Sequence, residues 1–301
     1  MDVLLALASA LITAFYFAYI SQVMKANKLL SSTALLSAGH LAAALVLLPV
    51  WLASVDVHSA LSLMTDHWTI ILSMAALLAI SRELYFYAYS RTDIANVTAF
   101  SALTPIYTLA FSFFLLGEFP SLNQFIGMLL ICGSIYALFL SPETQAGIKH
   151  RLLQPFMLLR SSRAVRCAFL ATIPTAYAAT LQKKLLLTFD VLSVSLILLF
   201  FVGTLSTASA ALSGRMKSVA ISVAELPMRT LLISALCLPL MHLLLSVVML
   251  NFDTSVALTL QRLSILFQII LGYFYLKERI QFKRRMLLGT MIIIGFCLIV
   301  T

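Results

Sequence analysis

The chain has 301 residues, of which 62% are hydrophobic and only 10% are charged. A soluble domain is closer to half apolar and a quarter charged, so this composition excludes an ordinary soluble fold and predicts a polytopic membrane protein. The formal net charge of +9 does not predict a nucleic-acid partner, because the basic residues lie between apolar runs, where they orient a chain in a membrane.

Apolar runs follow one another along the whole chain. Most are close to the roughly 20 residues that a bilayer-spanning helix needs, whereas the sixth and tenth are shorter. Only helices and closed barrels satisfy the backbone in hydrocarbon, and these runs lack the alternation of barrel strands, so we expect a helix from each. The runs cover residues 3–20, 34–54, 68–89, 94–116, 122–140, 167–182, 190–211, 230–250, 254–275 and 286–300.

The fourth and ninth runs resemble each other. Asp93 and Glu118 flank the fourth run at the same spacing as Asp253 and Glu278 flank the ninth, and each run precedes another with two glycines six residues apart. Internal repeats of this kind are common in membrane proteins. With the longest polar interval as the divider, we predict a five-helix repeat, a connecting loop and a second five-helix repeat at residues 1–140, 141–166 and 167–301.

Five spans per repeat is an odd number, so the second repeat must enter the membrane from the opposite side. The fold class predicted is an all-α membrane protein with ten transmembrane helices arranged as two inverted five-helix repeats. Sixteen basic residues lie in the loops after odd-numbered spans, and only Lys183 and Lys184 lie in the others. The positive-inside rule then puts the 141–166 loop in the cytoplasm and both termini outside, in the periplasm or the extracellular space. Lys183 and Lys184 do not fit this rule.

The fourth span carries Pro105 and then Leu116-Gly117-Glu118, with Gly127 following, and the second half repeats this as Leu276-Lys277-Glu278 and Gly289. With these motifs and the five-plus-five arrangement, the chain resembles the EamA-like branch of the drug/metabolite transporter superfamily. The resemblance implies a central cavity between spans one, three, four, six, eight and nine. It also implies alternating access and small organic solutes, often moved outward. The chain departs from the family pattern at Ile265, where the ninth span often has proline.

Ionisable side chains inside the predicted spans are few, and each is a functional candidate because burying it in hydrocarbon is costly. Arg82 and Tyr85 share one face of the third span, and Glu83 lies on a neighbouring face. His242 of the eighth span is the counterpart of Arg82, 160 residues later. A structural ion pair of Arg82 or Glu83 and a hydrogen-bonded histidine in a helix bundle are the alternatives.

Arg262, with Gln261 beside it, lies near the middle of the ninth span, where the first repeat has Ala102. Two interpretations are open. Arg262 forms a salt bridge with Glu83, or it binds an anionic or carboxylate group, which the planar guanidinium suits.

Hydroxyl-bearing side chains on the first, fourth and sixth spans complete the candidates. Such groups more often join helices to one another, and they are included because the resemblance places their spans around the cavity. The predicted substrate-binding set is Arg262, Gln261, Arg82, Glu83, Tyr85, His242, Tyr16, Ser101 and Tyr177.

No HExxH, GxSxG or Walker motif is present, so we predict no enzyme activity, no cofactor, no metal and no nucleotide-driven transport. The prediction is a secondary active transporter in the inner or plasma membrane, exporting a small polar metabolite such as an amino acid or another carboxylate. Its expected partners are this solute, membrane lipid and protons, and it is expected to act as a monomer or homodimer. The alternative is a flippase or exchanger for a phosphate-bearing lipid carrier or a sugar phosphate.

Overall fold

The computed structural model describes residues 2–27, 30–91, 97, 100–138, 157, 159–267 and 282–300. Throughout these residues the regular structure is helical and no strand occurs. Asp93, Glu278 and most of the predicted connecting loop lie outside the described residues. The helices are α1 (Asp2–Ala26), α2 (Ser32–Ser54), α3 (Val57–Asp66), α4 (Trp68–Arg91), α6 (Thr104–Leu116), α7 (Leu122–Leu138), α9 (Arg163–Leu186), α10 (Val191–Leu212), α11 (Met216–Ala224), α12 (Met228–Asn251), α13 (Thr254–Gln261) and α15 (Phe282–Val300).

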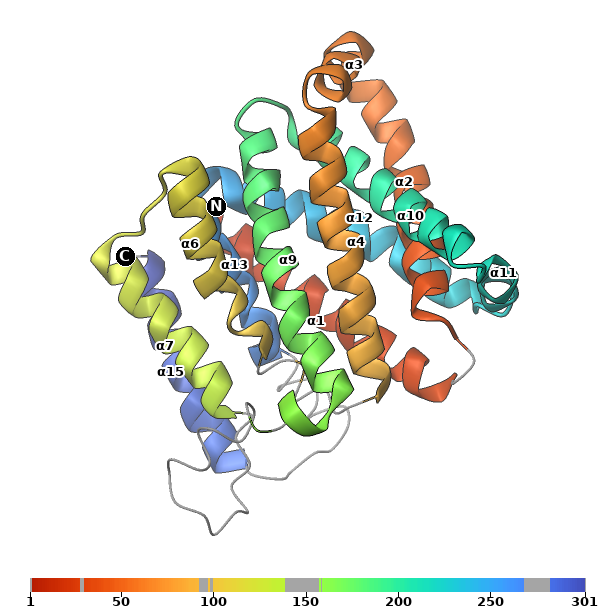
Figure 1. Cartoon of the computed structure of the whole chain (residues 1–301). Helices are drawn as coiled ribbons and strands as arrows, with labels where there is room; N and C mark the ends of the chain where they lie inside the picture. Colours follow the sequence, from red (N-terminus) through yellow and green to blue (C-terminus); the bar gives the residue numbers. More distant parts are fainter. Residues whose placement is uncertain are drawn as a thin grey trace.

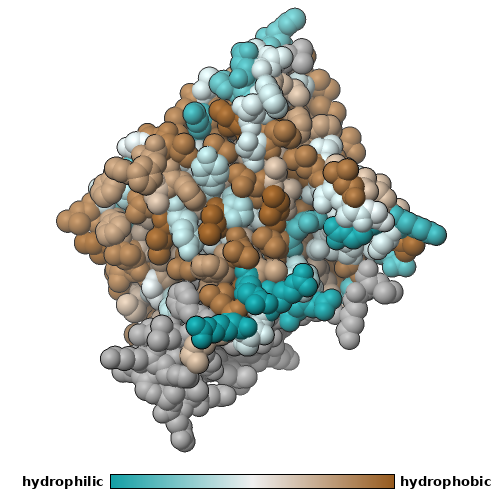
Figure 2. Space-filling model, in the orientation of Figure 1, coloured by the Kyte–Doolittle hydropathy of each residue, from teal (hydrophilic) through white to brown (hydrophobic). Residues whose placement is uncertain are grey.

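The helices have the length and composition of a multi-pass membrane protein. In the part of the chain that the structure describes, α1, α2, α4, α9, α10 and α12 are long and apolar enough to cross a bilayer. Shorter apolar helical segments at 104–116, 122–137, 254–267 and 287–300 coincide with the remaining four apolar runs. Hydrophobic residues cover most of the visible surface in Figure 2, and the most hydrophilic ones lie at its top, at its right and across its lower part.

The sixth span is longer than the sequence predicts. The apolar run covers residues 167–182, whereas α9 extends from Arg163 to Leu186. The helix continues through Lys183 because this side chain is buried and its ammonium group donates to the carbonyl oxygens of Met249 and Phe252. A lysine with such partners does not end a buried helix. Two short helices outside the ten runs, α3 and α11, were not predicted.

Four helix pairs form much of the packing: α4 with α9, α1 with α12, α2 with α10, and α7 with α15. Figure 1 shows α7 and α15 side by side, with the C-terminus beside the start of α7. A Cβ added to Gly127 would lie 2.5 Å from the carbonyl oxygen of Gly295 and 2.8 Å from a carbon of Ile299. A Cβ on Gly295 would instead meet Ile131 at 2.8 Å. The two helices therefore run antiparallel with their backbones in close approach.

The α2–α10 pair is antiparallel as well. Trp51 near the end of α2 donates to Ser193 near the start of α10, with 2.8 Å between Nε1 and Oγ. Ala34 at the other end of α2 clusters with Ala210 towards the end of α10. At the second contact, the small residues Ala34 and Ala210 let the helix backbones approach closely, which stabilises helix pairs in lipid.

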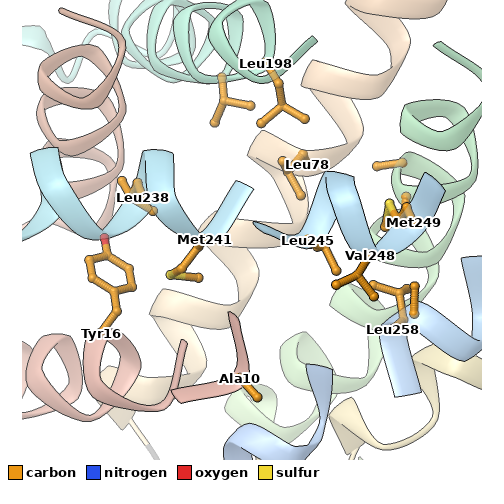
Figure 3. Packing of buried hydrophobic residues seen from close by; sticks show 14 of the residues in the cluster. Ala10, Tyr16, Leu78, Leu198, Leu238, Met241, Leu245, Val248, Met249 and Leu258 are labelled. Carbon is orange, nitrogen blue, oxygen red and sulfur yellow. The ribbon is translucent and has the colours of Figure 1, made fainter. Parts of the chain in front are cut away.

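Helix α12 crosses the centre of the bundle. Figure 3 shows its buried side chains facing residues of the surrounding helices. Tyr16 of α1 approaches α12 from one side, and Leu78 of α4 and Leu198 of α10 lie on the other. Most of the buried apolar residues belong to this one continuous cluster, so α12 links the packing of the two halves.

Two short helices begin or end at a break in the helical hydrogen bonding. Before α6, the Leu103 N–H bonds to the Phe100 carbonyl three residues back, and Pro105, one residue into α6, has no N–H to offer the Ser101 carbonyl. After α13, the Arg262 N–H bonds to Thr259 and the Ile265 N–H to Arg262, again three residues apart. The ninth span therefore breaks close to the position equivalent to the first break, although it lacks the proline.

Candidate functional site

A cavity of about 40 Å³ lies in the middle of the bundle, between α4, α9, α10, α12 and α13. Its polar lining comes from Arg82, Thr175, Gln182, His242 and Gln261, and its remaining lining is apolar. A cavity needs roughly 10–15 Å³ to hold one water, so this one accommodates a few. Pockets for organic ligands are about 300 Å³ or larger, so the cavity as it stands is too small for an organic solute and must widen to admit one.

Arg82 projects from α4 into this cavity. Its guanidinium carbon lies 5.3 Å from the ring centroid of Phe17 on α1, within the range of a cation–π contact. Its Nε atom is buried without a hydrogen-bond partner. A guanidinium remains charged at all physiological pH values, so the cavity contains a permanent positive charge with spare donor capacity.

His242 lines the same cavity from α12 and is 4% exposed. Neither of its ring nitrogens has a hydrogen-bond partner. Behind it, His40 of α2 is 1% exposed; its Nδ1 lies 2.9 Å from the Leu36 carbonyl oxygen, and its Nε2 has no partner. The charge of Arg82 acts on both rings. His40 was not a predicted site residue. The one feature of the sequence that marks it as a candidate is that it is an ionisable residue within an apolar run.

Arg262 and Gln261 lie at the end of α13. Gln261 lines the cavity, whereas Arg262 occupies the helix break just beyond it and has a buried Nε without a partner. Arg262 is close enough to Arg82 for their charges to repel. The structure contradicts the salt bridge to Glu83, because the Glu83 carboxylate instead accepts a 2.8 Å hydrogen bond from the Thr33 hydroxyl of α2. On α4, Glu83 faces a different neighbour from Arg82.

The predicted tyrosines lie outside the cavity lining. Tyr85 is buried, and its hydroxyl lies near Thr104 and Thr175 without hydrogen-bond geometry to either. Tyr16 is 1% exposed and points towards α12 in Figure 3. Their positions suit helix packing around the site rather than contact with the cavity as it stands.

The remaining two candidates lie near the fourth span. Ser101 is buried in the last turn before the break that precedes α6. Tyr177 of α9 packs its ring edge-on against Phe111 of α6, with 5.1 Å between centroids. Neither lines the cavity, so the arrangement brings together three of the nine predicted residues, namely Arg82, His242 and Gln261.

A second polar group joins the ends of four helices, and we call Glu118, Lys183, Asp253 and Thr254 the helix-end cluster. Lys183 of α9 donates to the last carbonyls of α12 and lies 3.9 Å from the Glu118 carboxylate, which follows α6. The other oxygen of Glu118 accepts from the backbone N–H of Thr254 at 2.8 Å, at the start of α13. Burial and the Glu118 carboxylate raise the pKa of Asp253, with Lys183 opposing them.

Among the described residues, no group of three histidine, cysteine or acidic side chains could hold a metal ion.

Comparison with known proteins finds a family match in the N-terminal part of the chain. Residues 1–140 match the sequence model of the EamA-like transporter family, which confirms the resemblance read from the spans and their motifs. No curated protein matches the chain. A solved structure described only as "Crystal structure of protein" matches with a TM-score of 0.67, covering 99% of this chain and 95% of its own, at 13% identity. At an identity this low, the structural match shows the fold of the whole chain and says nothing about its function.

Proposed function

We propose that this chain, whose residues 1–140 belong to the EamA-like transporter family, is a secondary active transporter that exports a small polar organic metabolite across the inner or plasma membrane. The observation that carries the proposal is the small cavity within an apolar helix bundle, lined in part by Arg82, His242 and Gln261. Charged and polar side chains at that depth are costly and mark solute pathways. Amino acids and other carboxylates are the first candidates, and the family points to a transporter rather than an enzyme.

The proposed architecture is two inverted five-helix repeats. Numbering the apolar segments in chain order, the second pairs with the seventh as α2–α10, and the fifth pairs with the tenth as α7–α15. Both pairs are antiparallel, as an inverted duplication requires of counterpart helices. The α4–α9 and α1–α12 contacts are equivalent in such a repeat, because the third and sixth segments correspond to the eighth and first. These contacts support the repeat boundaries at residues 140 and 167.

Alternating access requires the cavity to open to each side in turn, and the helix breaks provide hinges for it. The breaks before α6 and after α13 occupy equivalent places in the two repeats, and the second directly follows the lining residue Gln261. Discontinuous helices at repeat interfaces form the substrate sites of several transporter folds. Rocking one set of helices about these points would open the cavity without breaking the core around α12.

The flippase alternative is weakened by the position of Lys183. The sequence offered Lys183 and Lys184 as its one sign of a basic groove for a phosphate head group. Lys183 is instead buried and bound to Met249, Phe252 and Glu118, and only Lys184 is exposed. A single exposed lysine does not make a basic groove.

Transport by purified protein in proteoliposomes tests the proposal. Flux of a radiolabelled solute should require the protein and no ATP, and an imposed pH step should drive net movement if protons are the coupling ion. Flux that ignores pH but needs a counter-solute would make the protein an exchanger. Absence of flux for every solute that binds would contradict the transporter proposal itself.

A further inference from the structure

The basic side chains around the cavity have no described acid beside them. Arg82 and His242 line it, His40 lies behind His242, and Arg262 lies next to the lining residue Gln261. Within the described ranges, no carboxylate comes within ion-pair distance of any of these four, because Glu83 bonds to Thr33 and Glu118 belongs to the helix-end cluster. Buried charges normally have partners, and the guanidinium groups of Arg82 and Arg262 have no described counter-ion.

The unpartnered nitrogens point to where that anion would bind. His242 is 4% exposed and offers two free ring nitrogens, and the Arg82 Nε is free as well. A guanidinium and an imidazole N–H that line the same cavity can together hold an oxyanion, with a charge-assisted hydrogen bond from the guanidinium. The rest of the lining is largely apolar and includes Met241, Leu245 and Leu258.

We propose that Arg82 and His242 bind the acidic group of a small organic anion whose apolar body lies against Met241, Leu245 and Leu258. This deepens the proposed function and rests on it. The same lining argues against an α-amino acid, because an ammonium group beside Arg82 would meet a like charge and no described carboxylate. The preferred solute is therefore a carboxylate or phosphate ester that lacks a basic group.

A set of ligands matched in carbon skeleton tests this. Binding to the purified full-length protein would be measured by calorimetry and by thermal stability for 4-methylpentanoate, its neutral amide, L-leucine and an isohexyl phosphate. We expect the carboxylate or the phosphate ester to bind at least severalfold more tightly than the amide and leucine, and the stronger of the two identifies the oxyanion. Equal binding of the amide, or tighter binding of leucine, would overturn the anion assignment.

Substitutions assign the binding to the named residues. Arg82→Gln and His242→Asn should each weaken anion binding severalfold while leaving the weak binding of the amide unchanged. The matched control is Arg166→Gln, which removes an exposed arginine at the start of α9. If Arg82→Gln does not fold, Arg82→Lys keeps the charge but loses the fork and should bind the anion more weakly than the wild type. Wild-type affinity in Arg82→Lys and His242→Asn would refute the assignment.

The outcomes separate this inference from the proposed function. Anion binding without flux in proteoliposomes would leave the anion site standing and remove the transporter proposal. Flux of a neutral or cationic solute, unaffected by His242→Asn, would leave the transporter standing and remove the anion site.

A second inference comes from the helix-end cluster, whose residues lie next to residues that line the cavity. Gln182 lines the cavity, and the next residue is Lys183; Leu258 lines it too, one helical turn after Thr254. The bonds of Lys183 and Glu118 tie the ends of α9, α12 and α6 to the start of α13. We infer that this cluster closes the cavity on the side of the membrane opposite the basic loops, and that it must break for solute to pass.

Thiol accessibility tests this closure. In a variant whose four native cysteines are replaced by alanine, a Leu245→Cys probe in the cavity would be labelled with an impermeant maleimide from either membrane face. Lys183→Met should raise labelling severalfold from the cluster's side and lower it from the other side. The neighbouring exposed lysine supplies the control, because Lys184→Met should change neither rate.

A loss of stability alone would not give this pattern, since it would raise labelling from both sides. If Lys183→Met does not fold, Glu118→Gln removes the ionic partner while keeping an oxygen for the Thr254 N–H, and should shift labelling in the same direction. Unchanged labelling from both faces in the folded variant would refute the closure.

Discussion

Arg262 occupies a break in the helical hydrogen bonding, beside the cavity and without a described acidic partner. Arg262→Ala should therefore leave the free energy of unfolding almost unchanged while reducing transport strongly. Arg262→Lys should restore little, because the planar fork is lost. Denaturation and proteoliposome flux of the two variants check this. Removing one member of a buried ion pair would instead cost roughly 3–5 kcal/mol.

Glu83 provides the control for that experiment. Because its carboxylate bonds to Thr33 and not to Arg262, the double variant Arg262→Leu/Glu83→Leu should show additive stability changes, within about 0.5 kcal/mol. A double variant clearly more stable than the sum of its parts would establish a pair between the two residues and return Arg262 to a structural role.

Asp253 gives a pH dependence whose sign follows from its environment. Its pKa is raised in the folded protein by burial and by Glu118, so ionising it disfavours the folded state. The contribution of protonated Asp253 to stability is fully present below the ordinary pKa of the side chain and is lost as pH rises through the raised value. Asp253→Asn should therefore raise the melting temperature at neutral pH, and this gain should shrink as the pH falls. A constant difference across the titration would contradict it.

At the residue scale, the useful signal in the sequence is an ionisable side chain within an apolar run, because such residues are rare there. Arg82 and His242 were selected because ionisable groups seldom occur in apolar runs, and both line the cavity. The pairing of Glu83 could not be predicted, because helical periodicity assigns a side chain to a face but does not say which helix that face meets. Lys183 violated the charge rule for a reason visible only in three dimensions, namely the α12 carbonyls that it binds.

At the scale of elements, the contact between α7 and α15 depends on two glycines that the sequence marked only as a repeated pair. Gly127→Ala would place a Cβ 2.5 Å from the Gly295 backbone oxygen, and overpacking of this kind costs about 1–3 kcal/mol. Gly133→Ala is the matched control in the same helix, because nothing lies within 4 Å of its added Cβ and alanine favours helix by up to about 1 kcal/mol. Thermal unfolding of both variants, with Gly133→Ala at or above the wild type, checks the contact.

The helix breaks show where prediction of elements succeeds and where it fails. Pro105 signals the first break directly, because it lacks an N–H and disfavours a helical residue before it. Nothing comparable signals the second, since Ile265 replaces the proline and Arg262 sits at the break itself. Arg262 directly follows Gln261, which lines the cavity, and that surrounding is a property of the assembled bundle.

At the scale of the whole molecule, apolar length was enough to predict the apolar helices, though not the short helices α3 and α11, because lipid leaves the backbone no alternative. The way in which the helices pack was less accessible. The antiparallel contacts of α2 with α10 and of α7 with α15 join residues that lie more than 140 positions apart in the sequence. The sequence suggested the duplication that relates these helices but not the contacts themselves.

Orientation in the membrane is a prediction for the whole molecule, and it rests on charge. Figure 1 places both termini towards the same side of the bundle, and sixteen basic residues lie in the loops assigned to the other side. Of the two exceptions, Lys183 is held by α12 and Glu118, which leaves Lys184 as the one exposed lysine opposing the rule. In intact cells, with the native cysteines replaced, an impermeant maleimide should label a cysteine added after Thr301 and miss one placed at Gln145. Permeabilising the cells should expose Gln145→Cys, which controls for its reactivity. The reverse pattern, with Gln145→Cys labelled from outside, would overturn the orientation and with it the assignment of the helix-end cluster to the outer face.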